Sequence, residues 1–504
     1  MLRIGGMDFI KNALKLLELK STSEDGNEEV VNFLIPLFEQ MGAKLILQQI
    51  PHSLPDHNKR QYNLVAIFGD DLVDSRTRKG LLLTNHIDTA DPGAPEDWTE
   101  LLGKPWSPLE KDGFLYGPGA ADAKLDFLCK VAACETFKES KFREPVYLAA
   151  TCGADSLLQG SRYLIQSGAV NPRHVIVGSP TGLRVANRQK HHLVFRVRIS
   201  FVSIERDSQE FNAKIFISSR TRGVHVAHPE AQKSALANVM LFLDQIRNSP
   251  VPNRLFSFQG GSSLRKMPDT ATAGIVITSR DLDTIRDRFR SISANHRDCN
   301  FEMRFGGTGD RGLRLLPDEV YPVVFKLRDE VQRINDDLRA LRDDTFAIPE
   351  SQVILSAVRQ ERDYMDLILH YHVAPEFASE AQRKELEADL KRRIAAISSE
   401  CHTISLDCRR ILSVPHLITS ADSTFSQTLR ADLQRVGIST EFRSSSTTSE
   451  AGYFAEKGYE TVLFGPGENE GNAYCPNERV KVDDLMSAVS FYTRTIEAFC
   501  VRGI

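Results

Sequence analysis

Long hydrophobic runs are missing from this sequence. No stretch approaches the roughly 18–20 apolar residues that are needed to cross a bilayer. The opening segment, MLRIGGMDFIKNALKLLELK, mixes charges into an amphipathic pattern and lacks the uninterrupted apolar core of a signal peptide. We therefore expect a chain with no membrane partner.

An excess of one charge is missing as well, because 63 Lys and Arg residues nearly balance 67 Asp and Glu residues. This balance gives no overall field that would favour nucleic acid. The eight cysteines are scattered and include no CxxC pair, so neither a disulfide framework nor a cysteine metal site is expected. Free thiols of this kind are typical of the reducing cytoplasm, which is the predicted location.

The length of 504 residues predicts two domains, since single cores rarely grow so large. Residues 1–187 alternate between helical periodicity and short apolar runs that end in Gly, Pro, Asp or Asn. Residues 404–504 return to the same style, with the strand ETVLFGPG and a last helix. These two segments predict one discontinuous layered α/β domain, with its site at the strand ends.

The central residues 188–403 show a different pattern. LVFRVRISFVS alternates as a strand does, and strand–helix pairs follow it, which predicts an inserted α+β domain with helices on one face. An excursion at about 300–350 contains VVFKLRDEVQRINDDLRALRDD, whose spacing and charge predict an exposed amphipathic helix. It is interpreted either as a solvated surface helix or as an arm that docks a partner.

Metal-ligand types stand where the predicted sheet should end. The strand LLLTNHID delivers His86 and Asp88, and Asp122 lies in a Gly/Ala-rich turn before a helix. One imidazole with carboxylates from separate strand ends is the kind of donor set that zinc or cobalt takes. A structural histidine is the commoner explanation of an isolated His-x-Asp, so the ordered set of motifs matters more than any one of them.

Several blocks, in order, resemble the acetylornithine deacetylase / succinyl-diaminopimelate desuccinylase / aminoacylase family of dinuclear metallohydrolases. The blocks are NHIDTA, GFLYGPGAADAK, VGSPTGLRVANRQK, FQGGSSLRKMPDTAT and TSEAGYFAEKGYETVLFGPGENEGNAYCPNERV. The resemblance implies a zinc-exopeptidase-like catalytic-type domain with an inserted lid and dimerisation domain, and hence a homodimer. It also implies two Zn or Co ions and hydrolysis of N-acyl amino acids or short peptides.

Carried over by position, the resemblance implies that some site residues are kept and others replaced. His86 takes the place of a ligand, Asp88 supports it, and Asp122 takes the place of the bridging carboxylate. Ala154 stands where the general base should be, and Asp155 where the adjoining ligand should be. The resulting residual ligand set is His86, Asp122 and Asp155.

The remaining positions depart further from the family pattern. Ser179 and Tyr474 replace a carboxylate and a histidine ligand. Arg265 replaces a polar Asn of the lid, and with Glu450 it is assigned to substrate binding. The lid histidine that reaches the neighbouring subunit is assigned to His225, with His228 as the competing candidate.

These departures predict impaired chemistry. Each metal would lose one of three protein ligands, and a general base typically contributes about 10²–10⁴-fold. The leading interpretation is therefore a metallohydrolase-like pseudoenzyme that acts by binding a small molecule or peptide, with no zinc or one. One alternative is an active mono-metal deacylase held by His86, Asp122 and Asp155, because a single catalytic zinc commonly has three protein ligands. Another is an architectural protein that uses the 300–350 helix.

Overall fold

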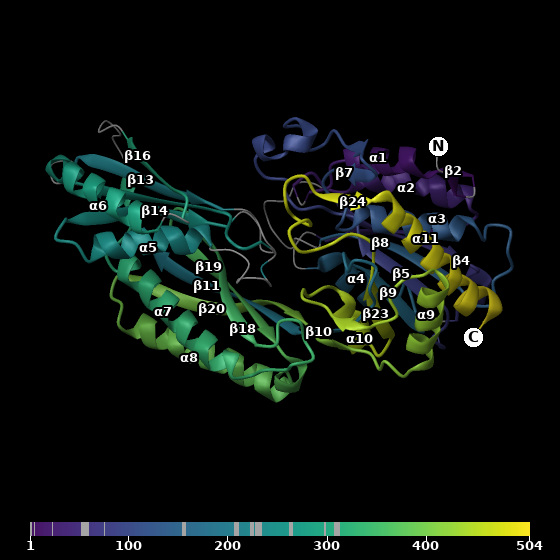
Figure 1. Cartoon of the computed structure of the whole chain (residues 1–504). Helices are drawn as coiled ribbons and strands as arrows, with labels where there is room; N and C mark the ends of the chain where they lie inside the picture. Colours follow the sequence, from purple (N-terminus) through teal and green to yellow (C-terminus); the bar gives the residue numbers. More distant parts are fainter. Residues whose placement is uncertain are drawn as a thin grey trace. The chain divides into compact units, whose positions relative to one another are not determined.

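A nine-stranded and an eight-stranded sheet form the centres of two units in the computed structural model of the chain (Figure 1). The first unit comprises Met1–His191, Asp344–Ile348 and Val414–Ile504, and the second comprises His192–Asp343 and Pro349–Ser413. The structure describes residues 3–4, 6–22, 24–51, 60–74, 76–153, 158–205, 211–221, 226, 234–261, 266–296, 299–306 and 313–503.

The large sheet of the first unit has the strand order β21-β10-β23-β9-β5-β8-β4-β3, with β22 paired to β10. Its strands are β3 (Lys44–Ile50), β4 (Gln61–Phe68), β5 (Leu81–His86), β8 (Val146–Thr151), β9 (His174–Gly178), β10 (Ala186–Gln189), β21 (Leu417–Ile418), β22 (Arg443–Ser444) and β23 (Glu460–Phe464). The four central strands β23, β9, β5 and β8 are parallel, so their carboxyl ends meet at one edge. That edge is where an open α/β sheet places its site.

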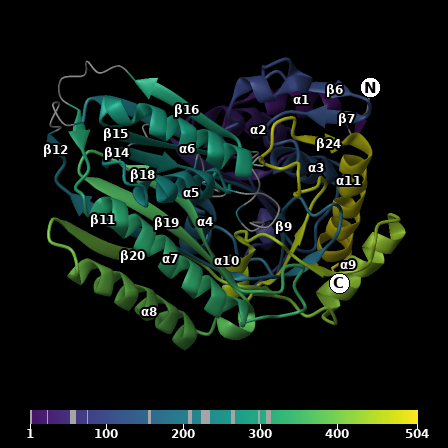
Figure 2. The same ribbon diagram turned by 60° about the vertical axis from the view of Figure 1, so that its left-hand side comes forward.

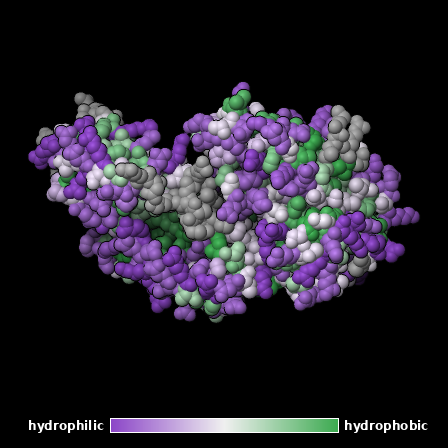
Figure 3. Space-filling view, viewed as in Figure 1, coloured by the Kyte–Doolittle hydropathy of each residue, from purple (hydrophilic) through white to green (hydrophobic). Residues whose placement is uncertain are grey.

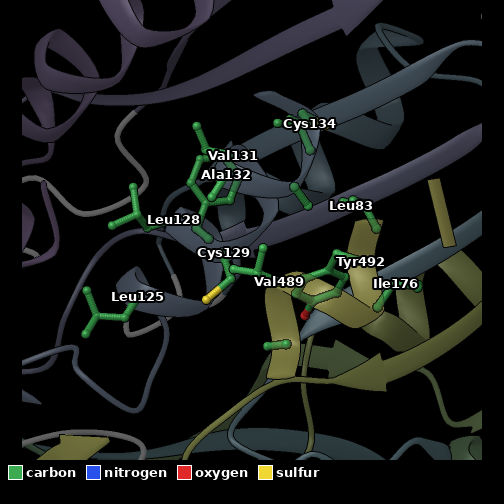
Figure 4. Close-up of a cluster of buried hydrophobic side chains, with 14 of the residues drawn as sticks. Leu83, Leu125, Leu128, Cys129, Val131, Ala132, Cys134, Ile176, Val489 and Tyr492 are labelled. Carbon is green, nitrogen blue, oxygen red and sulfur yellow. The ribbon is translucent and has the colours of Figure 1, made fainter. Parts of the chain in front are cut away.

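Helices cover both faces of this sheet. They are α1 (Phe9–Glu18), α2 (Glu28–Gln40), α3 (Lys124–Glu135), α4 (Gln159–Ser167), α9 (Thr424–Arg435), α10 (Ala451–Glu456) and α11 (Val482–Ile496), which continues as a π-helical turn (Glu497–Arg502). One apolar core packs α1, α2, α3, α9 and α11 on one face, and a second packs α4 and α10 on the other. Figure 4 shows part of the first core, where α3 side chains meet Leu83, Ile176, Val489 and Tyr492. Burial on both faces explains why β5 reads as LLLTNH without alternation.

Short strands complete the first unit. They are β1 (Arg3–Ile4), β2 (Met7–Asp8), β6 (Leu109–Lys111), β7 (Phe114–Tyr116) and β24 (Arg479–Lys481). β7 pairs antiparallel with β24, which ties the turn before α3 to the C-terminal part of the chain.

The second unit is a sheet with helices on one face. Its elements are β11 (His191–Phe201), β12 (Ile204–Glu205), β13 (Ala213–Arg220), α5 (Ala235–Arg247), β14 (Asn253–Gly260), β15 (Thr270–Ile277), α6 (Leu282–Asn295), β16 (Phe301–Gly306), β17 (Arg314–Leu315), α7 (Val320–Arg339), β18 (Gln352–Gln360), β19 (Tyr364–Val373), α8 (Glu380–Ser399) and β20 (Ile404–Val414). The ribbons of α5, α6, α7 and α8 lie along the sheet in Figure 2. Side chains of these helices join a single apolar core with one face of the sheet. The α+β prediction for the central domain is confirmed.

Two copies of one topology make up this second unit. The sheet order is β16-β13-β15-β14-β18-β19-β11-β20, and it divides into two halves between β14 and β18. When the strands of each half are numbered along the chain, both halves have the spatial order 4-1-3-2, read inward from the outer edge of the sheet. The inner half runs β13-α5-β14-β15-α6-β16, and the outer half runs β11-α7-β18-β19-α8-β20. The halves join where β14 pairs antiparallel with β18. The inner half is inserted in the outer one between β11 and α7, and β12 pairs with β17 where the chain enters and leaves it.

The predicted domain limits of 187/188 and 403/404 differ from the observed division. β10 completes the sheet of the first unit, which moves the first limit to 191/192. β20 is the edge strand of the second sheet, which moves the other limit to 413/414. Asp344–Ile348 also belongs to the first unit, where the backbone N–H of Ala347 donates to Ser444 Oγ at 3.0 Å.

The predicted excursion at 300–350 contains a helix that packs one face against the core of the second unit. Its helix is α7, which contributes Val320, Val324 and Leu338 to the core of the second unit. Only its outer face carries charge, and hydrophilic side chains cover the surface over α7 and α8 in the view of Figure 3. Heptad-like spacing is shared by docking helices and by helices that cover a sheet, so the pattern could not separate them.

Val324→Ala is expected to lower the free energy of unfolding of the second unit by about 1–3 kcal/mol, because a buried valine loses transfer energy and leaves a cavity. Val324 is 2% exposed. The matched control is Val202→Ala in the same unit, where the side chain is 79% exposed. Urea unfolding followed by far-UV circular dichroism compares the two, and equal midpoints would mean that α7 does not contribute to the core.

Among the described residues, no helix combines the length and the apolar character that a membrane crossing requires.

Candidate functional site

His86 is the last residue of β5, at the carboxyl edge of the parallel strands. Its Nδ1 lies 3.0 Å from the backbone oxygen of Asp88 and 3.6 Å from the carboxylate of the same residue. A ring that donates Nδ1–H to this carbonyl turns its Nε2 toward the opposite side, where Asp122 Oδ1 lies at 3.2 Å. The structure thus brings together three of the residues that the sequence predicts.

Charge is concentrated at this histidine. Burial alone lowers the pKa of His86, but neighbouring carboxylates, with Asp122 foremost and Asp88 and Glu450 behind it, raise the pKa to about 10. These carboxylates favour the imidazolium form of His86, with which Asp122 pairs at 3.2 Å. Their separation is also close to the distance of about 3 Å between two ligand atoms on one tetrahedral zinc ion.

Glu478 holds the turn that carries Asp122. Its carboxylate accepts hydrogen bonds from the backbone N–H groups of Gly119, Ala121 and Asp122 at 3.2, 2.8 and 3.0 Å. Its own backbone oxygen accepts from Gly117 at 3.0 Å. Burial raises the pKa of Glu478 to about 7, although the three N–H groups oppose the rise. The bridging position is thus rigidly presented by a residue far away in the chain.

A buried polar network lies directly beneath the site. Asp126 accepts hydrogen bonds from Asn85 Nδ2 at 2.8 Å and from the Tyr492 hydroxyl at 2.7 Å, and its Oδ2 pairs with Lys130 Nζ at 3.1 Å. Lys130 also donates to the backbone oxygen of Thr84 at 3.0 Å and to Asn85 Oδ1. The side chains of Asp126 and Lys130 are 1% and 0% exposed. Burial lowers the pKa of Lys130, and Asp126 opposes the change.

The sequence analysis did not identify this network. One signal was present, because Asp126 and Lys130 are charged residues four apart in a helix whose other residues are mostly apolar. Gly178 shows how tightly the network is enclosed, since a Cβ atom there would lie 1.8 Å from Asn85 Nδ2.

Ser179 follows β9 and is 8% exposed, so it stands at the same edge as His86. Its backbone oxygen would lie 2.5 Å from a Cβ atom at Gly465, which follows β23. Tyr474 lies in the loop between β23 and β24, with a left-handed φ of 64°. The serine and the tyrosine are both neutral groups.

Glu450 is 1% exposed and immediately precedes α10. Its charge contributes to the raised pKa of His86, so it lies in the electrostatic environment of the site. Within the described ranges, its Oε1 has no hydrogen-bond partner. A buried carboxylate oxygen of this kind is available to a ligand.

Ala154 and Asp155, His225 and His228, and Arg265 all lie outside the described residues. Within the described part of the chain, His86 and Asp122 have no third His, Cys, Asp or Glu close enough to complete a metal-holding group. The one such group found there is His192, His370 and His372 in the second unit.

Comparison with protein families matches residues 82–498 to the model described as Peptidase family M20/M25/M40. Curated relatives include the acetylornithine deacetylase of Photorhabdus laumondii, 33% identical over 178 residues, and that of Proteus mirabilis, 31% identical over the same length. Each match covers 35% of this chain and 42% of the relative, so the chain spans less than half the length of these relatives.

Solved structures share the fold over nearly the whole chain. Di-peptidase Dug1p from Saccharomyces cerevisiae has a TM-score of 0.58 at 11% identity, covering 97% of this chain and 95% of its own. Human carnosine dipeptidase 1 has a TM-score of 0.56 at 12% identity, covering 97% and 96%. An M20 family metallo-carboxypeptidase from Sulfolobus solfataricus has a TM-score of 0.54 at 15% identity, covering 97% and 99%.

Proposed function

Since the chain belongs to peptidase family M20/M25/M40, we propose that it is a metallohydrolase-like protein whose hydrolytic chemistry is impaired and whose cleft acts by binding. The observation that carries this proposal is the donor set. His86 and Asp122 stand at ligand distance from each other, whereas the two positions that the resemblance assigns to the outer ligands hold Ser179 and Tyr474.

The residues present do not fit a pair of zinc ions. A dinuclear site that activates water needs enough ligands to seat both ions. The positions assigned to the two outer ligands hold Ser179 and Tyr474, which have no negative charge at neutral pH and are weak zinc ligands. Alanine at position 154 cannot move a proton, which removes general-base catalysis of the usual kind.

What remains is a group of buried polar side chains. His86 and Asp122 offer a charged pair, and Glu450 offers a buried carboxylate oxygen. A ligand with an ammonium or amide N–H donor complements these acceptors, because a buried charge is stable only when it is paired. We assign the ligand to the class of N-acyl amino acids or short peptides, with Arg265 as a further contact for its carboxylate.

A mono-metal amidohydrolase is the second candidate. The His86–Asp122 separation of 3.2 Å favours it, because two ligands of one ion are already in place. Asp155 would supply the third protein ligand that catalytic zinc sites commonly have. In this version Glu450, or the lid residue His225, holds the proton that the chemistry moves.

The experiment separates the two candidates by turnover. The untagged chain, supplied with Zn²⁺ or Co²⁺, is assayed against a panel of N-acyl amino acids and dipeptides, with binding of the same compounds measured by calorimetry. We expect binding without metal-dependent hydrolysis. Turnover that needs the metal and disappears in His86→Ala would overturn the proposal and favour the mono-metal enzyme.

A gain-of-ligand variant makes the same test in the opposite direction. Ser179→Asp combined with Tyr474→His is expected to strengthen zinc binding at the first unit at least about 100-fold, since even outer-shell changes alter metal affinity by about 10–100-fold. Ser179→Asn with Tyr474→Phe is the matched control, because it changes size similarly without adding a strong ligand. Competition with a chromophoric chelator measures both, and equal affinities would contradict the assignment of the two positions.

Two wider expectations remain proposals. We propose a homodimer formed through the second unit, as the sequence resemblance implies, to be measured by sedimentation of the untagged chain. We also propose a cytoplasmic location, with which the eight free cysteines agree.

A further inference from the structure

Three histidines converge on the helix-free face of the second unit's sheet. Along β19, Leu367, Leu369 and Tyr371 face the core that the helices cover. Their alternating neighbours His370 and His372 therefore point to the opposite face, and both are buried, at 2% and 3% exposed. On the neighbouring strand β11, Leu193 joins the same core, which places His192 on the face of the two histidines.

The three rings are in direct contact. His192 Nε2 lies 2.9 Å from His370 Nδ1, so one of these nitrogens donates a hydrogen bond to the other. The His192 ring stacks on His370 at 5.0 Å and on His372 at 4.5 Å between centroids. One ligand atom from each residue lies within 4.8 Å of those of the other two.

We propose that His192, His370 and His372 bind one Zn²⁺ ion, at a site in the second unit that does not include His86 or Asp122. Neutral imidazole is a common zinc ligand, and three imidazoles with an open fourth position form a known type of zinc site. Two of the ligands lie two residues apart on one strand, and the third lies on the adjacent strand. Their backbone positions are fixed in advance, because hydrogen bonds between the strands hold them in place.

Binding requires a limited rearrangement of the rings. A metal lies in the plane of each imidazole it binds, whereas the His192 and His372 planes are only 6° apart. Rotation about χ2, a broad torsion in histidine, would make the planes converge. The ring that donates the hydrogen bond between His192 and His370 would change tautomer, losing that proton to solvent and taking one up at its other nitrogen, so both facing nitrogens could bind the ion as neutral imidazoles.

Three neutral histidines would leave the double positive charge of the zinc ion uncompensated. Within the described residues, no carboxylate joins the three histidines in the metal-holding group. Asp366, on the same face of β19, is about 13 Å from His370 along the strand at about 3.3 Å per residue. It is already paired with Arg198 at 2.7 Å. A water molecule or a small anion would complete the coordination of such a cationic site.

A metal ion bound here would cross-link two strands of the outer half of the second unit. β11 and β19 are its first and third strands, and His192 is the first residue of the unit along the chain. Since a ligand that binds only the folded state stabilises it by mass action, zinc should raise the unfolding midpoint of this unit.

The test measures zinc directly on the full-length, untagged chain. Zinc content by mass spectrometry and affinity by chelator competition are determined for wild type, His86→Ala, His372→Asn and the exposed control His402→Asn. Co²⁺ substitution adds the absorption spectrum of the bound ion. We expect one zinc equivalent to survive in His86→Ala and His402→Asn, and its affinity to fall at least about 100-fold in His372→Asn, more than outer-shell changes produce.

The outcomes are distinct from those of the proposed function. Equal zinc affinities in His372→Asn and His402→Asn would overturn this site. Complete loss of zinc binding in His86→Ala would overturn it as well. Where His372→Asn does not fold, as judged by circular dichroism, His192→Gln at the start of β11 makes the same comparison. Hydrolysis need not be measured, so failure of one proposal leaves the other intact.

Discussion

Lys130→Met is expected to lower the free energy of unfolding of the first unit by about 3–5 kcal/mol, because removing one partner of a buried ion pair leaves the other charge uncompensated. The Asp126 carboxylate would lose its ammonium partner while remaining 1% exposed. Asn85 Oδ1 and the backbone oxygen of Thr84 would also lose a donor. Methionine keeps the length and much of the volume of the lysine side chain, so packing changes little.

The control for this variant is Lys15→Met, which removes an ion pair with Glu18 whose side chains are 56% and 49% exposed. Exposed pairs contribute about 0–1 kcal/mol, so little change is expected. Both tryptophans, Trp98 and Trp106, belong to the first unit, so their fluorescence in urea reports its unfolding. Equal losses of unfolding free energy in Lys130→Met and Lys15→Met would contradict the expected effect of the buried pair.

Pairing two substitutions isolates the charge. Lys130→Met combined with Asp126→Asn removes both charges and keeps an oxygen that can accept from Tyr492. Because the lone charge is then gone, the double variant should recover part of the stability lost in Lys130→Met. A double variant less stable than either single one would mean that hydrogen bonding, not charge, dominates the network.

Glu478→Ala is expected to lower the free energy of unfolding of the first unit by about 3–5 kcal/mol, since each of three buried N–H groups left without an acceptor costs about 1–3 kcal/mol and entering water offsets part of this. The turn that presents Asp122 would lose the carboxylate that holds Gly119, Ala121 and Asp122. Tryptophan fluorescence in urea again gives the measurement. The control is Glu470→Ala, an exposed glutamate in the same loop, for which no loss beyond about 0.5 kcal/mol is expected.

The same residue predicts a pH dependence. The pKa of Glu478 is raised from 4.5 to about 7 in the folded state, so folding is favoured when the group is protonated. Its contribution is present below pH 4.5 and is lost as the pH rises toward 7. Relative to Glu478→Gln, which does not titrate, the wild type should therefore lose stability over this range. A pH-independent difference between the two would show that the folded-state pKa is not raised.

The sequence was sufficient to predict the layered α/β unit and the proximity of His86 and Asp122. His86 and Asp122 could be found because parallel strands place ligands at their carboxyl ends and the flanking glycines mark the turns. The partners of Asp126 could not be found, because they come from β5, α3 and α11, elements that only the folded chain brings together. Tertiary contacts of this kind leave no local periodicity.

The second unit shows another limit of sequence. The heptad-like spacing and many charges of helix α7 predict an exposed helix, and no local pattern reveals that a second sheet lies beneath it. His370 and His372 stand in plain alternation on a predicted strand, but His192 is far from them in the chain. Only the pairing order of the strands joins the three.

The nesting of one βαββαβ half within another constrains how the chain can fold. The outer half cannot assemble until α7, β18 and the later strands have been synthesised, because β11 is separated from them by the whole inner half. Contacts between residues so far apart in the chain form slowly, since the entropy cost of closing the loop comes before the contacts stabilise it. If the inner half folds first, pairing of β12 with β17 brings the end of β11 close to the start of α7. Each halving of an open loop lowers its closure cost by about 0.6 kcal/mol, so the inserted half shortens the search instead of lengthening it. The folded inner half thus brings the two separated parts of the outer half together.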